Sequence, residues 1–239
     1  MRRVFFAIVF VVRHPRSLIK LLLRQWPSDI PFDRIVNSIS KEPVILEAGV
    51  GKGIHTVAFA EAFPQARIFG FEPIIELYRE AESRCNKYPN IKLFNLAIFD
   101  TNSDKVELYW SEREAHESAS VLEPNDFMKD YFPQIRFEST RTVEGITLDT
   151  FVKSEGITTI DLLWLDLQGA ELRILTHGAN HTLEITQSVH IEVARKQVYH
   201  GASLIQEVTE FFSSKGFSIR EKEMGLVFGN ILFVRNRVT

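Results

Sequence analysis

The sequence predicts an α/β fold, built on a mostly parallel β-sheet with helices on both faces. Short apolar runs that end in glycine or polar residues alternate with segments of helical periodicity from residue 44 onward. A glycine-rich turn at residues 49–53 joins the first apolar run to the first helical segment. The chain has 239 residues and 45% hydrophobic content, which is enough for one large domain. We therefore predict a domain at residues 41–239, preceded by a separate segment at 1–40.

The first half of this domain predicts alternating strands and helices. Strands are expected at residues 44–48, 67–72 and 91–99, and helices at 54–63 and 73–85. Pro64 stops the first helix. Cys85 falls on the apolar pattern of the second helix, so we expect it to be buried. Because it is the chain's single cysteine, an internal disulfide is excluded.

The second half begins irregularly and then returns to the same alternation. Within residues 103–146 we expect strands at 105–110 and 136–146, with a polar loop between them. The remaining expected elements are a helix at 147–156, a strand at 160–169, a helix at 170–179, a strand at 188–194, a helix with a Ser203–Gln206 capping box ended by Gly216, and a strand at 229–236. Ligands of such sheets bind at the carboxyl ends of the strands.

The N-terminal segment carries basic and apolar residues. Residues 1–28 hold six basic residues and no acid, so the rest of the chain is more acidic than the net charge of −3 indicates. An acidic body does not suggest a nucleic-acid partner. The apolar run 4–12 is shorter than the roughly 20 residues of a membrane span, and no small-residue cleavage site follows it. Two interpretations stay open: packing on the domain, or peripheral contact of residues 1–26 with a membrane.

We accordingly expect a cytoplasmic protein, either free or peripheral on the inner face of the membrane.

The glycine-rich turn indicates a nucleotide site that is not built for phosphate. Glu47, Gly49, Gly51 and Gly53 form the pattern E-x-G-x-G-x-G. The third glycine comes one residue too early for the dinucleotide fingerprint G-x-G-x-x-G, and the phosphate-loop pattern is absent. An acid beside the turn would repel a pyrophosphate and favour a cation. S-adenosylmethionine carries an ammonium and a sulfonium and no phosphate, so we predict it as the cofactor, with a purely structural turn as the alternative.

Two further strand ends agree with this prediction. Glu72 closes the second strand in "FGFEP", where a carboxylate can accept hydrogen bonds from ribose hydroxyls. A surface acid at a strand end is the alternative. The backbone near Ala97, in "NLAIFD" at the end of the third strand, is placed to meet an adenine edge.

The motifs resemble those of a known family. "VILEAGVGKG", "FGFEP", "NLAIFD", "SASVL", "GITLDTF" and "LLWLDLQGAELRIL" occur in the order seen in FkbM-type S-adenosylmethionine-dependent methyltransferases, over roughly residues 42–218. The resemblance implies a Rossmann-like class I methyltransferase fold, with a seven-stranded sheet whose final strand is antiparallel. It also implies O-methylation of a hydroxyl, with a sugar, glycolipid or natural product as acceptor. The family's glycine loop is closer to D-x-G-A-N-x-G, so the finer cofactor contacts differ here.

Polar residues after the later strands are candidates for the chemistry. Asp166 is expected to hold the cofactor's ammonium, with Gln168 and Glu171 near the acceptor, although Glu171 could equally cap the next helix. For the general base we favour His116, because the resemblance places the following serine-rich segment over the site and imidazole has a suitable pKa. Glu192, near another strand end, is a second catalytic candidate, and a paired structural role is equally open.

No ligand spacing in the sequence demands a metal, so we predict no metal site, although Asp166, Glu171 and Glu192 would supply oxygen ligands if one existed. Two rival functions remain at this point. An NAD-dependent oxidoreductase is disfavoured by the glycine spacing, and a non-catalytic nucleotide-binding module is disfavoured by the intact motifs. The sequence does not identify the acceptor, which residues 103–146 and the N-terminal segment are expected to bind.

Overall fold

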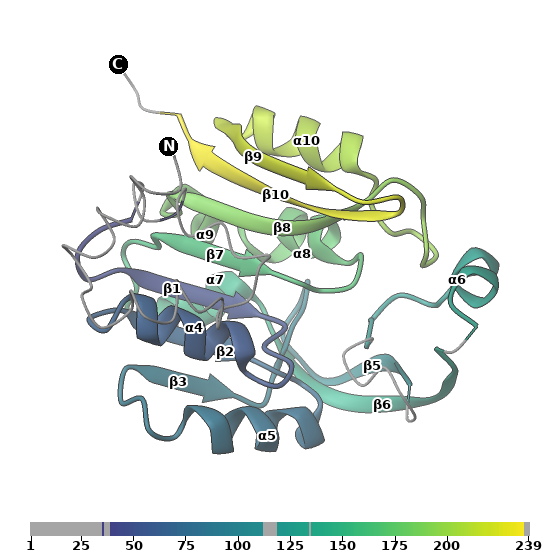
Figure 1. Cartoon of the computed structure of the whole chain (residues 1–239), viewed down its shortest axis with the longest axis horizontal. Helices are drawn as coiled ribbons and strands as arrows, with labels where there is room; N and C mark the ends of the chain where they lie inside the picture. Colours follow the sequence, from purple (N-terminus) through teal and green to yellow (C-terminus); the bar gives the residue numbers. More distant parts are fainter. Residues whose placement is uncertain (1–34, 36–38, 112–118, 134, 237–239) are drawn as a thin grey trace, which may run out of the picture.

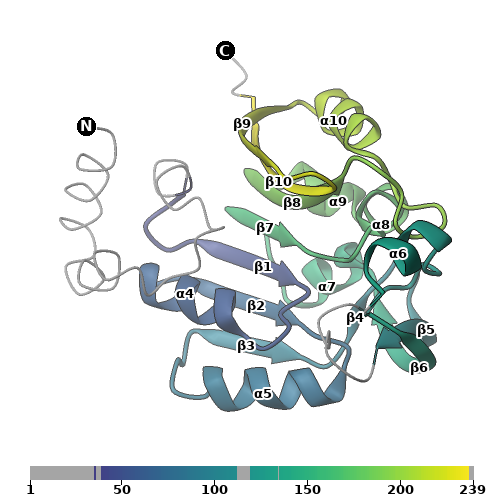
Figure 2. The same ribbon diagram turned by 45° about the vertical axis from the view of Figure 1, so that its right-hand side comes forward.

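The structure is a computed structural model that describes residues 35, 39–111, 119–133 and 135–236 (Figures 1 and 2). The predicted N-terminal segment lies almost wholly outside these residues, so the boundary between residues 40 and 41 stays a prediction. Among the described residues, no helix is long and apolar enough to cross a membrane.

The main sheet has seven strands in the order β3-β2-β1-β7-β8-β10-β9. Its members are β1 (Val44–Ala48), β2 (Arg67–Phe71), β3 (Ile91–Phe94), β7 (Leu162–Leu165), β8 (Ser188–Ala194), β9 (Phe217–Met224) and β10 (Phe228–Arg235). The first five strands of the order pair in parallel, and β10 pairs antiparallel with both of its neighbours. The mostly parallel sheet and its antiparallel final strand are thus confirmed.

Helices cover both faces of this sheet (Figure 1). They are α4 (Ile54–Ala62) and α5 (Ile75–Cys85) on one side, and α7 (Leu148–Ser154), α8 (Glu171–Gly178), α9 (Asn180–Glu184) and α10 (Ile205–Ser214) on the other. Alternate strand residues face the two layers, because successive side chains of a strand point to opposite faces. Ile45 packs in the cluster that includes Phe59 of α4, whereas Leu46 packs in the cluster that includes Phe151 of α7.

A second, three-stranded sheet projects beside the carboxyl ends of the main strands, at the right of Figure 1. It consists of β4 (Ala97–Ile98), β5 (Ser103–Ser111) and β6 (Phe137–Ile146). The short helix α6 (Asp126–Tyr131) lies between β5 and β6 in the chain. The strand predicted at 91–99 is therefore two strands in different sheets. Asn95 marks the break, because its side-chain amide donates to the carbonyl oxygens of Glu72 and Pro73, at 2.9 Å each, and the chain turns away there.

Two other predictions need correction, and three elements were missed. The strand expected at 160–169 ends at Leu165, where the chain turns under the glycine loop. The predicted Ser203–Gln206 capping box does not form: Leu204 is the N-cap of α10, it has no side-chain acceptor, and its N–H donates to the Glu207 carboxylate at 2.7 Å. The elements α6, α9 and β9 were not predicted. Cys85 is buried as expected, at 3% exposure.

Candidate active site

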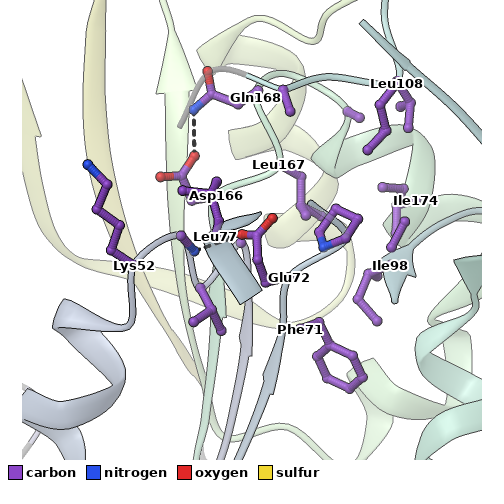
Figure 3. Close-up of a pocket in the computed structure, with 18 of the residues that line it drawn as sticks. Lys52, Phe71, Glu72, Leu77, Ile98, Leu108, Asp166, Leu167, Gln168 and Ile174 are labelled. Carbon is purple, nitrogen blue, oxygen red and sulfur yellow. Dashed lines mark hydrogen bonds between the residues drawn. The ribbon is translucent and has the colours of Figure 1, made fainter. Parts of the chain in front are cut away.

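A cavity of about 490 Å³ opens at the carboxyl ends of β1, β2 and β7 (Figure 3). The loops after these strands supply most of its polar wall, as expected for a parallel sheet. Six of the eight predicted cofactor residues line it: Gly49, Gly51, Glu72, Ala97, Asp166 and Gln168. Residues far apart in the sequence thus meet in one place.

The glycine loop packs directly on the turn that follows β7. Gly49 has φ +90°, and its N–H donates to the carbonyl oxygen of Phe71 at 3.0 Å. A Cβ at this position would lie 2.1 Å from the carbonyl oxygen of Asp166. Only glycine allows both this backbone conformation and this close approach.

Glu72 fixes the glycine loop from the neighbouring strand. Its carboxylate accepts hydrogen bonds from the N–H groups of Gly51 and Ile74, at 2.8 Å each. The side chain is 5% exposed, and the carboxylate lies at the cavity wall (Figure 3). Because each carboxylate oxygen has more than one lone-pair site, Glu72 can still accept hydrogen bonds from a ligand.

Asp166 and Gln168 form a hydrogen-bonded pair after β7. The amide of Gln168 donates to Oδ1 of Asp166 at 2.8 Å (Figure 3). Gln168 has φ +54° and is held from two other segments. Its backbone carbonyl accepts from the Ser120 hydroxyl at 2.9 Å, and its side-chain oxygen accepts from the Tyr199 hydroxyl at 3.3 Å. A non-glycine residue in the left-handed region indicates a constrained turn.

Two further carboxyl groups lie behind this pair. Glu171 accepts hydrogen bonds from the N–H groups of Leu167 (2.8 Å) and Gly169 (3.3 Å). Its carboxyl group therefore stabilises the turn after β7, and Glu171 does not line the cavity. Burial raises the pKa of Glu171 to about 7. Burial also raises the pKa of Glu192 well above its usual value, and the charges of Asp166 and Glu171 raise it further.

Three predicted site residues, Glu47, Gly53 and Glu192, do not line the cavity. Glu47 is fully buried beneath the glycine loop. Gly53, at φ +78°, packs against Ala81 and Cys85 of α5, where a Cβ would approach within 3.2 Å of both residues. Gly53 therefore joins the loop to α5.

The histidines differ in their position relative to the cavity. His116 lies outside the described residues, so its predicted role stays a prediction. His55 lines the cavity, which the sequence did not indicate beyond its place after the glycine loop. His190, which shares a strand with Glu192, stacks on Trp164 with ring centroids 3.5 Å apart.

Lys52 is a second lining residue that sequence reasoning missed. The apolar part of the wall, including Leu77, Ile98 and Ile174, was also not predicted, because it comes from helices and from the second sheet. No cluster of three or more His, Cys, Asp or Glu side chains placed to hold a metal ion occurs within the part of the chain that the structure describes.

Comparison with known proteins identifies this arrangement. Residues 47–219 match the profile of the methyltransferase FkbM domain. The chain belongs to the FkbM methyltransferase family. Its cofactor is therefore S-adenosylmethionine, and its fold is that of the class I methyltransferases. The dinucleotide oxidoreductase alternative is wrong.

Several known proteins are similar to the chain. The FkbM chain is 28% identical over 187 residues to the 2-O-methyltransferase NoeI of Sinorhizobium fredii, covering 76% of each protein. It is 20% identical over 207 residues to the methyltransferase sdnD of Sordaria araneosa, covering 77% of each. A chain in the crystal structure of a fibrillarin/Nop5p complex has a TM-score of 0.49 and 13% identity, over 86% of this chain and 80% of that one.

The cavity of the FkbM chain fits S-adenosylmethionine in its distribution of polarity. Figure 3 shows Glu72 near the middle, Asp166 and Lys52 to one side, and Ile98, Ile174 and Leu108 to the other. The apolar side suits adenine, the Glu72 carboxylate suits the ribose hydroxyls, and the Asp166 carboxylate suits a positively charged group.

Proposed function

We propose that this FkbM methyltransferase transfers the methyl group to a hydroxyl oxygen of a sugar, glycolipid or natural product. The observation that carries the proposal is the similarity to the 2-O-methyltransferase NoeI over 76% of both chains. The carboxyl groups beside the cavity support it, since a hydroxyl nucleophile must lose a proton to a nearby base.

The reaction needs alignment of the acceptor and removal of one proton. S-adenosylmethionine supplies the methyl group: a bond forms between the methyl carbon and the acceptor oxygen as the carbon–sulfur bond breaks, and its electron pair stays on sulfur. Asp166 and Glu72 would orient the cofactor. A protein base would take the hydroxyl proton.

Glu192 is our proposed base among the described residues. Its side chain is largely buried, and this burial raises its pKa, which the neighbouring charges of Asp166 and Glu171 raise further. A carboxylate with a raised pKa is a stronger base than an exposed one. His116, from the sequence prediction, is the second candidate.

The first experiment is a methyl-label transfer screen over sugars, glycolipids and phenols, followed by variants in the substrate found. We expect an oxygen-methylated product. Glu192→Gln should lower kcat about 10²- to 10⁴-fold with cofactor affinity within a few-fold. In the unaltered enzyme kcat should fall as pH drops through the raised Glu192 pKa, because the protonated carboxyl group cannot accept a proton.

His116→Ala separates the two candidates, since only the variant that lacks the true base should lose this acid limb. A product methylated on nitrogen or sulfur would contradict the proposed function. Full activity in both variants would contradict the assignment of the base.

A further inference from the structure

Lys52 is the one charged residue of the glycine loop at positions 49–53, and it lines the cofactor cavity. Figure 3 shows its side chain on the same side of the cavity as Asp166, beyond Glu72 and opposite the apolar wall. This end of the cavity therefore offers one cationic and one anionic side chain.

The backbone of Lys52 is held on three sides. Its carbonyl oxygen accepts a hydrogen bond from Nε of Arg84 at 2.8 Å. The neighbouring N–H of Gly51 is bound by Glu72, and Gly53 on the other side packs on α5. The root of the lysine side chain is thus fixed beside the cavity, although the flexible stem of a lysine lets its ammonium group adjust to a ligand.

The amino-acid end of S-adenosylmethionine presents opposite charges a few ångströms apart, an ammonium and a carboxylate. Asp166 matches the ammonium. The carboxylate would enter a cavity whose described wall already contains the carboxyl groups of Glu72 and Asp166, which repel it. Among the lining residues that the structure describes, the candidates for a cationic partner are Lys52 and His55, and the lysine side chain is the one that offers three N–H donors on a long flexible stem.

We propose that Lys52 binds the carboxylate of the cofactor's methionine moiety, while Asp166 binds the ammonium group of the same moiety. The pair makes the site selective for a cofactor with an intact amino-acid end. The inference concerns the methyl donor alone, so it is independent of the acceptor and of the proposed general base.

Three ligands distinguish the contribution of the carboxylate from that of the ammonium group. Their affinities for the 239-residue chain are measured by calorimetry. S-adenosylmethionine has both charges, decarboxylated S-adenosylmethionine lacks the carboxylate, and 5′-methylthioadenosine lacks the whole amino-acid end. Lys52→Met should weaken S-adenosylmethionine about 10- to 100-fold, the usual loss for a charge-assisted hydrogen bond, and leave the other two ligands unchanged. Lys52→Arg should retain most of the affinity.

Asp166→Asn is the complementary variant. It should weaken both S-adenosylmethionine and its decarboxylated form, but not 5′-methylthioadenosine. The contact between Gly49 and Asp166 involves the backbone carbonyl, so the loop should keep its shape. Lys222→Met, on the edge strand β9, removes the same charge far from the cavity in the sheet order and should change none of the three affinities.

An equal loss for all three ligands in Lys52→Met would mean that the lysine only shapes the loop, and would overturn the inference. Unchanged affinity for S-adenosylmethionine would overturn it as well. If S-adenosylmethionine failed to bind the unaltered chain, the cofactor assignment itself would fall together with this inference. A failure of the acceptor screen, in contrast, would leave the binding result intact.

Discussion

At the scale of single residues, Glu47 combines a charged side chain with complete burial. It is 0% exposed, and its hydrogen-bonding neighbour is the Thr56 hydroxyl, which lowers the pKa of Glu47 without forming a regular hydrogen bond to it. Burial raises its pKa to about 7, and the nearby His55 opposes this rise only in part. A substantial fraction of Glu47 is therefore neutral at physiological pH. The carboxyl groups that line the cavity are those of Glu72 and Asp166, and these two remain our proposed contacts to the cofactor.

The burial of Glu47 predicts a pH-dependent stability. The folded chain keeps the Glu47 proton up to about pH 7, whereas the unfolded chain loses it near pH 4.5. The free energy of unfolding should therefore fall as pH rises through this window, by about 2 kcal/mol between pH 5.5 and 8 from this residue. Glu47→Gln should remove this part of the slope, as measured by urea unfolding at the two pH values.

Glu171 contributes in the same direction, so the slope should decrease rather than vanish. The exposed Glu144 provides the control, and Glu144→Gln should leave the slope as it was. An identical slope in Glu47→Gln and the unaltered chain would contradict the prediction.

Carboxylates at strand ends were the site residues easiest to predict. Glu72 and Asp166 follow short apolar runs, and the geometry of a parallel sheet brings such positions together. The depth of Glu47 could not be predicted, because it depends on how α4 lies over β1. Lys52 was missed because a lysine in a glycine-rich loop is, on sequence alone, an ordinary exposed residue.

At the scale of elements, the contact between the glycine loop and the turn after β7 holds the two polar halves of the cavity together. Gly49 permits this contact, since any side chain there would collide with the Asp166 carbonyl. The ends of β1 and β7 are thus fixed relative to each other, in addition to their parallel pairing.

Gly49→Ala should consequently damage the site more than a comparable substitution elsewhere. Gly201 is the matched control, because it also has a left-handed φ of +76° but has open space where a Cβ would lie. Gly201→Ala should cost only the conformational strain, about 1–2 kcal/mol. Gly49→Ala should cost more and weaken cofactor binding more than tenfold, as thermal unfolding and calorimetry would measure. Equal losses in the two variants would show that the contact is unimportant.

Most elements of the main sheet could be predicted, because their apolar runs are long or bounded by glycine and proline. The division of residues 91–99 between two sheets could not, since the hydrogen bonds of Asn95 to residues 72 and 73 exist only in the folded chain. Helix α6 was missed because six residues give too little periodicity to recognise.

At the scale of the whole molecule, the charge of the chain is uneven. Six basic residues and an apolar run occupy positions 1–28. These positions lie outside the residues that the structure describes. Packing on the domain and contact with an anionic membrane surface both stay open, and for the second each basic residue would contribute roughly 1 kcal/mol near such a surface.

If the segment contacts membranes, the 239-residue chain should bind vesicles containing anionic lipid in a co-sedimentation assay. Replacing the six basic residues of 1–28 by glutamine should weaken this binding more than tenfold, because the electrostatic attraction is lost. Neutral vesicles should not distinguish the two proteins. Equal binding of both proteins to anionic vesicles would favour the alternative, in which the segment packs on the domain.

The two ends of the chain segment that forms the second sheet lie side by side. Ala97 and Ile98 of β4 pair in parallel with Gly145 and Ile146 of β6, so the chain departs from the main domain and returns to it at neighbouring positions. A stretch anchored at adjacent points can be exchanged or lengthened with little effect on what it is anchored to. We therefore predict that grafting the corresponding stretch of another family member between these anchors changes the acceptor, provided that the graft keeps Leu108, which lines the cofactor cavity, and Ser120, which holds Gln168.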